Sequence, residues 1–312
     1  MRILSLPEIR QSLRYGEIID RMHDALIAYS RGECDTPMPM HLDIAGAAEV
    51  HMKSSYRRGG SYFALKIAST FPQNASHGLP VGNGMMLLSS AETGEPVAFL
   101  ADAGHLTDVR TAAVSAMVAR ELGRKDRILG ILGTGIQARL TARLHAEVLP
   151  LERIVIWGRS PERAAICAGE IADLVPDTDV AVAACPADVA REARLIVTCT
   201  ASRGPLLHDG EVAEETYISA VGSDSQGKQE LDPSILRTAS LVLADSRRQC
   251  EKLGELQHAP ELVGRAVEIG EFCERRESYP DGITVCDFTG LGVEDLYIAE
   301  WVYERSLAAS SL

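Results

Sequence analysis

Three small residues follow a short apolar run near the middle of the chain. Ile128 to Leu132 has the length and composition of a buried strand, and Gly133, Gly135 and Ala138 come after it in the spacing G-x-G-x-x-A. In a strand–turn–helix unit, the first glycine allows a tight turn and the second lets the backbone approach a pyrophosphate. The third small residue lets the helix pack close to the strand. This pattern suits a dinucleotide whose phosphates lie at the start of the helix.

The segments that follow supply the context that the glycine pattern requires. Gln137 to Leu149 is rich in helix-forming residues, and Ile154 to Trp157 is typical of a second strand. Strand, glycine turn, helix and strand in this order favour a dinucleotide site over a glycine turn that binds nothing. The expected cofactor contacts from this stretch are Gly133, Thr134, Gly135, Ile136, Gln137 and Ala138.

The end of the second apolar run indicates which dinucleotide binds. A carboxylate about 20 residues after the first glycine would bind the ribose 2′-hydroxyl of NAD. Here Gly158, Arg159 and Ser160 occupy that place. A guanidinium can bind a 2′-phosphate through two hydrogen bonds, which a carboxylate would repel. We therefore predict NADP, with Arg159 and Ser160 as ligands. NAD is the alternative cofactor, and Arg159 would then be a solvated loop residue.

The ends of two later strands carry further polar residues. Thr200 and Ala201 end one run in small side chains that suit a place beside a dinucleotide. Val221 and Gly222 end the next, and we count all four as cofactor contacts because ligands of such folds lie at the carboxyl ends of the strands. Asp224 follows in a turn flanked by glycines, where it could transfer a proton or bond its own backbone as an Asx turn.

Two cations stand among apolar or small neighbours in the first third of the chain. Lys66 lies within the run Tyr62 to Ala68, where alternation puts Phe63 and Leu65 on the opposite face. Arg110 lies near the start of a helical segment of small residues. Each is either exposed to solvent or directed into a site, and the pattern alone leaves both possibilities open.

These residues must be positioned by regular elements, and from Arg127 onward strands and helices alternate. Beyond the two runs above, we expect strands at Val180–Ala184, Leu195–Thr200, Thr216–Val221, Leu241–Ala244 and Ile283–Asp287. The alternation is the sequence form of an α/β, Rossmann-type doubly wound sheet. Helices are also expected at Gln249–Leu262 and at Glu294–Leu307.

The earlier part of the chain has a different pattern. An apolar stripe predicts a helix that starts near Pro7 and runs to Ser30, and Met40 to Leu100 is typical of strands joined by turns. Thr107 to Leu122 predicts a helix, and the polar turn after it marks a domain boundary. We therefore expect an α+β domain over residues 1–122 and a Rossmann-type domain over 123–292.

Composition excludes several classes of function. The 312 residues carry a net charge of −13, which argues against nucleic acid and anionic membranes as partners. The seven cysteines are scattered without a C-x-x-C pair, as expected for reduced thiols and not for a disulfide framework or a metal site. The sequence has no apolar run long enough to span a bilayer and no leader-like N-terminus. We expect a cytoplasmic protein without a bound metal.

Several motifs resemble the ornithine cyclodeaminase/mu-crystallin family, in the same order along nearly the whole chain. They are Gly78–Pro80, Ala91–Pro96, Leu106–Ala113, Gly133–Ala138, Gly222–Leu231 and Thr289–Leu296. The resemblance implies a homodimer whose first domain, completed by the C-terminal helix at 293–312, builds the subunit interface and part of the substrate pocket. It implies NAD or NADP in the second domain, and chemistry at the C–N bond of an amino acid.

The resemblance also assigns roles to single residues. Lys66 and Arg110 match the family's ligands of the substrate carboxylate, and Asp224 matches its acid/base near the substrate nitrogen. Lys66 is therefore expected to act with Asp224 in catalysis as well as to bind substrate. Gly292 and Val293, in the last motif, are expected to line the substrate pocket.

Other positions depart from the family pattern. His41 stands near the place of an arginine or lysine found in many relatives, so it would be a weaker, pH-dependent contact for a carboxylate. A glutamate for the distal amine of ornithine has no clear counterpart near Val50 to Met52, where Glu49 is the closest acid. Arg159 resembles the NADP-using ketimine reductases. These departures favour a ketimine reductase or amino-acid dehydrogenase. A cyclodeaminase that converts ornithine to proline and ammonia with catalytic NAD, and a non-catalytic NADP-binding protein, are the alternatives.

Overall fold

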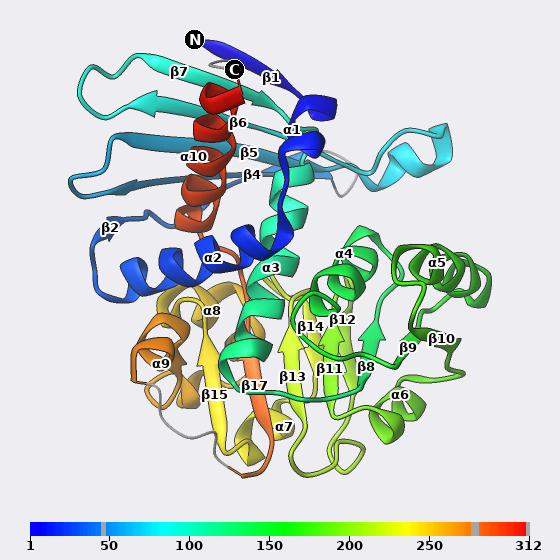
Figure 1. Ribbon diagram of the computed structural model, residues 1–312. Coiled ribbons are helices and arrows are strands. Elements are labelled where there is room, and N and C mark those ends of the chain that lie inside the picture. The colour runs from blue at the N-terminus through cyan, green and yellow to red at the C-terminus, as the bar shows by residue number, and fades with distance from the viewer. Residues whose placement is uncertain (45–47, 276–280, 310–312) are drawn as a thin grey trace. The chain divides into compact units, whose positions relative to one another are not determined.

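A computed structural model describes residues 1–44, 48–275 and 281–309 (Figure 1). The chain divides into two compact units. Unit 1 comprises Met1–Arg110 and Leu291–Leu312, and unit 2 comprises Thr111–Gly290. One division falls within helix α3 (His105–Glu121), and the other immediately precedes helix α10 (Gly292–Ala309).

Unit 1 is built on one mostly antiparallel sheet. Its strands are β1 (Arg2–Ser5), β2 (Cys34–Asp35), β3 (Met40–Ile44), β4 (Ala48–Arg57), β5 (Tyr62–Thr70), β6 (Gly82–Ser90) and β7 (Pro96–Ala101). Among the described residues the order is β1-β7-β6-β5-β4-β2, and β3 also pairs with β4. Only the pairing of β1 with β7 is parallel within this sheet as described.

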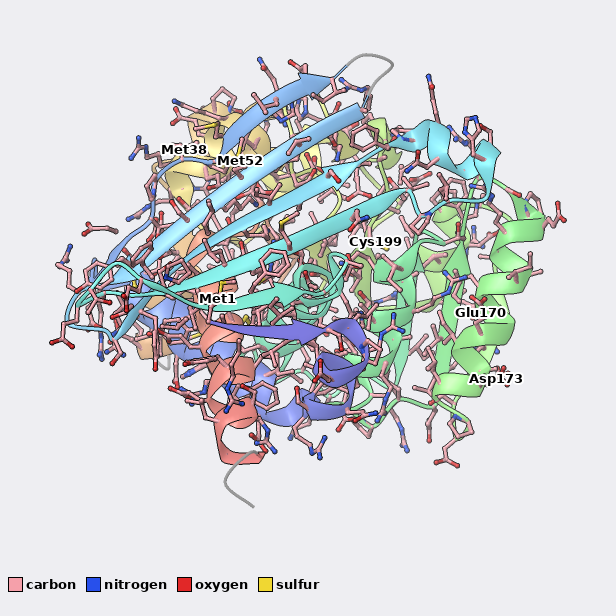
Figure 2. The ribbon with its side chains drawn as sticks, turned by 90° about the horizontal axis from the view of Figure 1, so that it is seen from above. Met1, Met38, Met52, Glu170, Asp173 and Cys199 are labelled. Carbon is pink, nitrogen blue, oxygen red and sulfur yellow. The ribbon has the colours of Figure 1, made fainter. Side chains whose placement is uncertain are left out.

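One face of this sheet is covered and the other is open. The helices of the unit are α1 (Leu6–Ser12), α2 (Tyr15–Ser30), the 3₁₀ turn η1 (Pro72–His77) and α10. Helix α10 packs on β4, β5 and α2. Along β5, Ala64 and Lys66 are buried while Phe63 and Leu65 are exposed, so the predicted alternation is confirmed. Figure 2 shows β4 to β7 face-on, with Met52 labelled on β4.

The helix expected to run from Pro7 to Ser30 is two helices. Leu13 is in an extended conformation and packs into the core, and α2 begins only after Arg14, which is also extended. The hydroxyl of Ser12 donates to the carbonyl of Ile9 at 2.7 Å and closes the first helix. The periodic apolar stripe continued through this break, which is why the sequence pattern did not show it.

Unit 2 contains the predicted Rossmann-type sheet. Its strands are β8 (Ile128–Leu132), β9 (Arg153–Trp157), β10 (Asp179–Val182), β11 (Leu195–Thr198), β13 (Tyr217–Ala220), β15 (Leu241–Ala244), β16 (Val267–Glu268) and β17 (Thr284–Asp287). They lie in the order β10-β9-β8-β11-β13-β17-β15-β16, and neighbouring strands in this order are parallel. The order reverses between β8 and β11, which is where ligands bind in such sheets.

Helices and a small second sheet complete unit 2. The helices are α4 (Ile136–His145), α5 (Pro161–Leu174), α6 (Pro186–Glu192), α7 (Pro233–Thr238), α8 (Arg247–Leu253) and α9 (Ile269–Arg275), with 3₁₀ turns η2 (Glu255–His258) and η3 (Pro260–Leu262). Strands β12 (Arg203–Leu207) and β14 (Gln229–Leu231) form the small sheet, which the sequence pattern missed. The core is built of strand residues such as Ile196, Ile218 and Val285.

The helix expected over Gln249–Leu262 was wrong beyond Leu253. Gly254 is extended, and a side chain there would collide with the carboxylate of Asp287. The same carboxylate accepts the backbone N–H groups of Glu255 and Leu256, both at 2.9 Å. These bonds redirect the chain into 3₁₀ turns.

In the described part of the chain, no helix is both long and apolar enough to cross a bilayer.

Candidate active site

The glycine turn of unit 2 lies at the point where the strand order reverses. Gly133 has φ +144°, and a Cβ there would lie 2.6 Å from the sulfur of Cys199 at the end of β11. Only glycine fits a backbone that is both in this conformation and this close to a neighbouring strand end. Cys199 also donates its N–H to the carbonyl of Leu132 at 2.8 Å, which ties the two strand ends together.

The start of α4 is open to a ligand. Gly135 is the N-cap, has no side chain to bond the first N–H groups of the helix, and a Cβ built there would meet nothing within 4 Å. Gly135 and Ile136 are exposed, while Ala138 is buried against the sheet. Arg139 braces the turn by donating to the carbonyls of Thr134 and Gly135, both at 2.9 Å. Exposed N–H groups at a helix start suit a phosphate, so these residues fit the dinucleotide expected there.

A buried carboxylate that the sequence reading did not single out positions two further loops. Glu230 accepts the N–H and the hydroxyl of Thr200 at 2.6 and 2.7 Å, the hydroxyl of Thr198 at 2.7 Å and the N–H of Gly222 at 2.9 Å. Burial raises the pKa of Glu230, although these hydrogen bonds act to lower it. Its side chain therefore fixes the predicted cofactor contacts that follow β11 and β13 in one arrangement.

Asp224 and Arg159, two further predicted site residues of unit 2, are accessible. The Asp224 carboxylate is 46% exposed and lies 2.6 Å from the ammonium of Lys228. Its N–H donates to the carbonyl of Gly222, and the hydroxyl of Ser225 donates to its carboxylate. Arg159 is exposed at the end of β9. The hydroxyl of Ser160 accepts the N–H of Arg163 and caps α5, so Ser160 has a structural partner already.

In unit 1 the two predicted cations meet at one buried carboxylate. The ammonium of Lys66 lies 3.1 and 2.9 Å from the two carboxylate oxygens of Asp295, in the first turn of α10. Arg110 donates through Nε to Asp295 at 3.1 Å and through Nη1 to Glu294 at 2.8 Å. All four side chains are at most 5% exposed. The structure therefore brings Lys66 and Arg110 together.

The protonation of Lys66 and Asp295 depends on two opposing influences, burial and the neighbouring charges. Burial lowers the pKa of Lys66 to about 7, although Asp295 favours its charged form. Burial also opposes ionisation of Asp295, but Lys66 and Arg110 outweigh it and hold its pKa below the usual value. Lys53 acts on both groups as a further positive charge, and it lies directly opposite Lys66 in the pairing of β4 with β5.

Three cations and two acids make up this group. Lys53, Lys66 and Arg110 are the cations, and Glu294 and Asp295 are the acids. We call these five residues the cation cluster. The buried carboxylate of Asp102 acts on Asp295 as a further negative charge. Several cations gathered at one place suit a carboxylate ligand, which a guanidinium and an ammonium can bind through charge-assisted hydrogen bonds.

The neighbouring predicted pocket residues have structural roles at the start of α10. A Cβ at Gly292 would collide with the backbone of Ser54, so only glycine lets α10 approach β4 this closely. Val293 is fully buried. Leu291 donates its N–H to Glu294 at 3.0 Å, which fixes the first turn of the helix.

His41 lies on the same sheet face as Lys66, two strands away. It stands opposite His51, and His51 stands opposite Ala68, which is two residues from Lys66 along β5. The Nε2 atom of His41 is 2.9 Å from the Asp43 carboxylate and its Nδ1 is 3.5 Å from Nδ1 of His51. In this structure His41 thus belongs to a group of its own on β3 and β4.

The sequence contained evidence for some of the site residues that were not predicted. Glu294 and Asp295 are adjacent acids at a helix start, and cations inside an apolar strand need buried anions. Glu230 lies within a motif matched to the family, between two strands, without an evident surface role. Lys53 was hidden because the sequence does not state the register of β4 with β5.

Comparisons with known proteins agree with this architecture. The model of the ornithine cyclodeaminase/mu-crystallin family matches residues 2–310. A putative dehydrogenase of Rhizobium meliloti is 36% identical, covering 100% of this chain and 97% of the relative. An archaeal alanine dehydrogenase dimer with bound NAD superposes with a TM-score of 0.91 at 26% identity, covering 99% and 97% of the two chains. The iminosuccinate reductase of Paracoccus denitrificans, in complex with NAD⁺, superposes with a TM-score of 0.89 at 27% identity, with the same coverage.

Proposed function

The chain belongs to the ornithine cyclodeaminase/mu-crystallin family, and from that premise we propose that it is an NAD(P)-dependent oxidoreductase acting on the C–N bond of an amino acid or cyclic imino acid. The observation that carries the proposal is the cation cluster, in which Lys66 and Arg110 converge on Asp295 with a third cation, Lys53, beside them. Two of the similar proteins, an alanine dehydrogenase and an iminosuccinate reductase, are named for reactions at such a bond.

The cation cluster is proposed to hold the substrate carboxylate. Arg110 is anchored by Glu294 and Asp295, so its guanidinium is fixed before substrate arrives. Lys66 is fixed by Asp295 in the same way. A carboxylate that binds there brings a negative charge close to Lys53, Lys66 and Arg110, and it favours the ammonium form of Lys66.

The turn after β8 and the start of α4 are proposed to hold the dinucleotide pyrophosphate. The open space above Gly135 and the uncapped helix start support this assignment. A bound nicotinamide would supply hydride exchange with the carbon of the substrate C–N bond. Arg159 is proposed to bind the 2′-phosphate of NADP, because it is an exposed cation at the end of β9 and the acid typical of NAD sites is absent from this place.

Asp224 is proposed to hold and release the proton on the substrate nitrogen. Its carboxylate is accessible and follows the strand end at Gly222, whose N–H is fixed by Glu230. Lys228 holds the carboxylate by an ion pair at 2.6 Å. A carboxylate that can both accept and donate a proton suits the interconversion of an imine and an amine.

We further propose that two copies of the chain associate through the open face of the unit 1 sheet. One apolar row crosses that face: Ile3 pairs with Phe99, Phe99 with Leu87 and Leu87 with Leu65. Ile3 is 66% exposed and Leu65 is 37% exposed. A contiguous apolar face of this kind marks an interaction surface in a protein with a sizeable core of its own. Sedimentation of the wild type and of Leu65→Glu tests it, and a wild-type monomer would contradict it.

The reaction is tested by measuring cofactor oxidation and ammonia release in the same purified sample. Oxidation of NADPH or NADH with cyclic or open-chain imino acids, and no ammonia from ornithine, is the expected result. Ammonia and proline from ornithine without net cofactor change would make the protein a cyclodeaminase. Binding of a dinucleotide without either reaction would make it a non-catalytic binding protein.

Two substitutions separate the parts of the proposal. Arg159→Ala should lower the preference for NADPH over NADH about tenfold or more, because one charge-assisted contact to the phosphate is lost. Arg163→Ala, one helical turn on, is the matched control and should leave the ratio unchanged.

Asp224→Asn should lower kcat at least a hundredfold while dinucleotide affinity persists. Near-wild-type turnover of Asp224→Asn would rule out its proton-transfer role.

A further inference from the structure

Two imidazoles face each other at the edge of the unit 1 sheet. His41 on β3 stands directly opposite His51 on β4, and Asp43 stands directly opposite Glu49 in the same register. Since side chains two residues apart share a face of a strand, all four project to one side. The two rings meet edge to face, with centroids 4.6 Å apart and an interplanar angle of 67°.

The carboxylates beside the two imidazoles lie on the Nε2 side of each ring. Nε2 of His41 lies 2.9 Å from the Asp43 carboxylate, and Nε2 of His51 lies 3.5 Å from the Glu49 carboxylate. A carboxylate only accepts, so the hydrogen bond to Asp43 places a hydrogen on Nε2 of His41. The two Nδ1 atoms are 3.5 Å apart and face each other. When Nε2 carries the hydrogen in both rings, a cation between the two Nδ1 atoms is bound by both lone pairs.

We propose that His41, His51 and Glu49 form a binding site for a divalent transition-metal ion of the zinc class. One ligand atom from each residue can be chosen so that all three lie within 4.8 Å of one another. Metal–nitrogen bonds of about 2.0–2.1 Å in a tetrahedral site place ligand atoms about 3.4 Å apart, which is close to the observed separation of the two Nδ1 atoms.

The surroundings of the site match what metal-binding histidines require. A histidine ligand usually donates its other ring N–H to a carboxylate, which fixes the tautomer and orients the ring. Asp43 does this for His41. Two imidazoles and one carboxylate favour Zn²⁺, Co²⁺ or Ni²⁺ over Mg²⁺ or Ca²⁺, which prefer oxygen ligands.

Accessibility allows an ion to enter and leaves room for a further ligand. The side chains of His41, His51 and Glu49 are 37%, 17% and 23% exposed. Three protein ligands leave a fourth tetrahedral position for water or an anion. The ion would join β3, an edge strand, to β4, and it requires neither dinucleotide nor substrate, so the inference goes beyond the proposed reaction.

Calorimetric titration of the chelator-treated, full-length chain with Zn²⁺ tests the site. We expect one saturable ion per chain and a higher Tm with the ion present. His51→Ala should lower the affinity at least a hundredfold. Asp43→Asn should lower it about tenfold, because it removes only the carboxylate that orients a ligand.

A matched control and a spectroscopic probe make the result decisive. His77→Ala removes a histidine that contacts Ser76 and Gln73 in η1, and it should bind Zn²⁺ like the wild type. Circular dichroism verifies that each variant is folded, and Glu49→Gln provides a conservative third variant.

Substitution with Co²⁺ should give the absorption of nitrogen and oxygen ligation. Thiolate-to-cobalt absorption, equal affinity in the wild type and His51→Ala, or no saturable binding would each overturn the proposal. Cofactor oxidation does not enter these readouts, so failure of the site and failure of the proposed reaction are distinguishable.

Discussion

Unit 1 and unit 2 each bury several charged side chains, but they satisfy them in different ways. In unit 1 the carboxylate of Asp295 is met by the charged groups of Lys66 and Arg110. In unit 2 the carboxylates of Glu230 and Asp287 are met by backbone N–H groups and hydroxyls. The first arrangement is an ion-pair network, and the second is a set of neutral donors around single charges.

The difference bears on our proposal that the cation cluster binds the substrate carboxylate. A carboxylate surrounded by N–H groups holds loops in place and offers no charge to a ligand, and burial raises the pKa of both Glu230 and Asp287, the latter to about 7. The cation cluster instead gathers several cations and holds Lys66 and Arg110 by bonds to two acids. Buried ion pairs rarely add net stability over apolar packing, which supports the proposed binding role of the cluster.

The largest effect is expected from Asp295→Ala. Removing this carboxylate leaves Lys66 and Arg110 buried without their shared partner, and breaking such a pair costs about 3–5 kcal/mol. The chain has two tryptophans, Trp301 in unit 1 and Trp157 in unit 2. In a Trp157→Phe background, the fluorescence of Trp301 reports the denaturant unfolding of unit 1 alone.

An exposed ion pair of the same helix provides the control for Asp295. Glu304 lies 3.7 Å from Arg21 and is 53% exposed. Glu304→Gln should change the free energy of unfolding by less than about 1 kcal/mol, as surface pairs do. A loss of less than 1 kcal/mol for Asp295→Ala as well would mean that the cation cluster is not held together by its charges.

Glu230→Gln should give the second largest effect, about 2–3 kcal/mol. The amide NH₂ group of glutamine would face N–H and O–H groups whose hydrogen bonds the carboxylate now accepts. At least one buried donor would therefore lose its acceptor. We expect lower stability of unit 2, followed through Trp157 in a Trp301→Phe background, and a higher KM for the dinucleotide because the loops at Thr200 and Gly222 are released. Asp232→Asn is the matched control.

Asp232 makes the same kind of contact as Glu230 at the surface. Its carboxylate accepts the N–H of Ser234 at 2.9 Å and caps α7, with the side chain 33% exposed. Asparagine is an equally good N-cap, so Asp232→Asn should cost less than about 0.5 kcal/mol. Equal losses for Glu230→Gln and Asp232→Asn would show that burial does not distinguish the two carboxylates.

The sequence predicted the elements of each region better than their contacts. The α/β, Rossmann-type class followed from local alternation and was confirmed, because strand length and apolar content are local properties. The position of Lys66 on the buried face needed the sheet, and its partner Asp295 lies 229 residues away. Asp295 lies in a motif matched to the family, and the C-terminal helix was expected to join the first domain. Nothing local in the sequence states which strand residue the helix contacts, so the ion pair with Lys66 could not be predicted.

The errors of prediction had physical causes of the same kind. The apolar stripe from Ile9 to Tyr29 has helical periodicity throughout. The helix nevertheless ends at Leu13, which is extended and packs in the core. The helix expected over Gln249–Leu262 ended early because the Asp287 carboxylate, distant in sequence, bonds the N–H groups that the helix would need. In each case a tertiary contact outweighed a local preference.

The prediction that separates binding from folding concerns the pH dependence of Lys66. Burial lowers its pKa to about 7, so its ammonium is present below pH 7 and lost above it. If the ammonium holds the substrate carboxylate, kcat/KM should be constant below pH 7 and fall by up to tenfold per pH unit above it, since kcat/KM reports groups of the free enzyme. Lys66→Arg should stay active to higher pH, because a guanidinium keeps its charge.

The stability of the fold should change with pH in the opposite direction to kcat/KM. Between pH 7 and the ordinary lysine pKa, the unfolded chain binds the proton that the folded chain has released, so this group makes unfolding less favourable as pH rises. The wild type should therefore gain stability relative to Lys66→Met across that range while its kcat/KM falls. A kcat/KM that stays level to pH 9 would show that Arg110 and Lys53 bind the carboxylate without the Lys66 charge, and that the ion pair with Asp295 serves the fold alone.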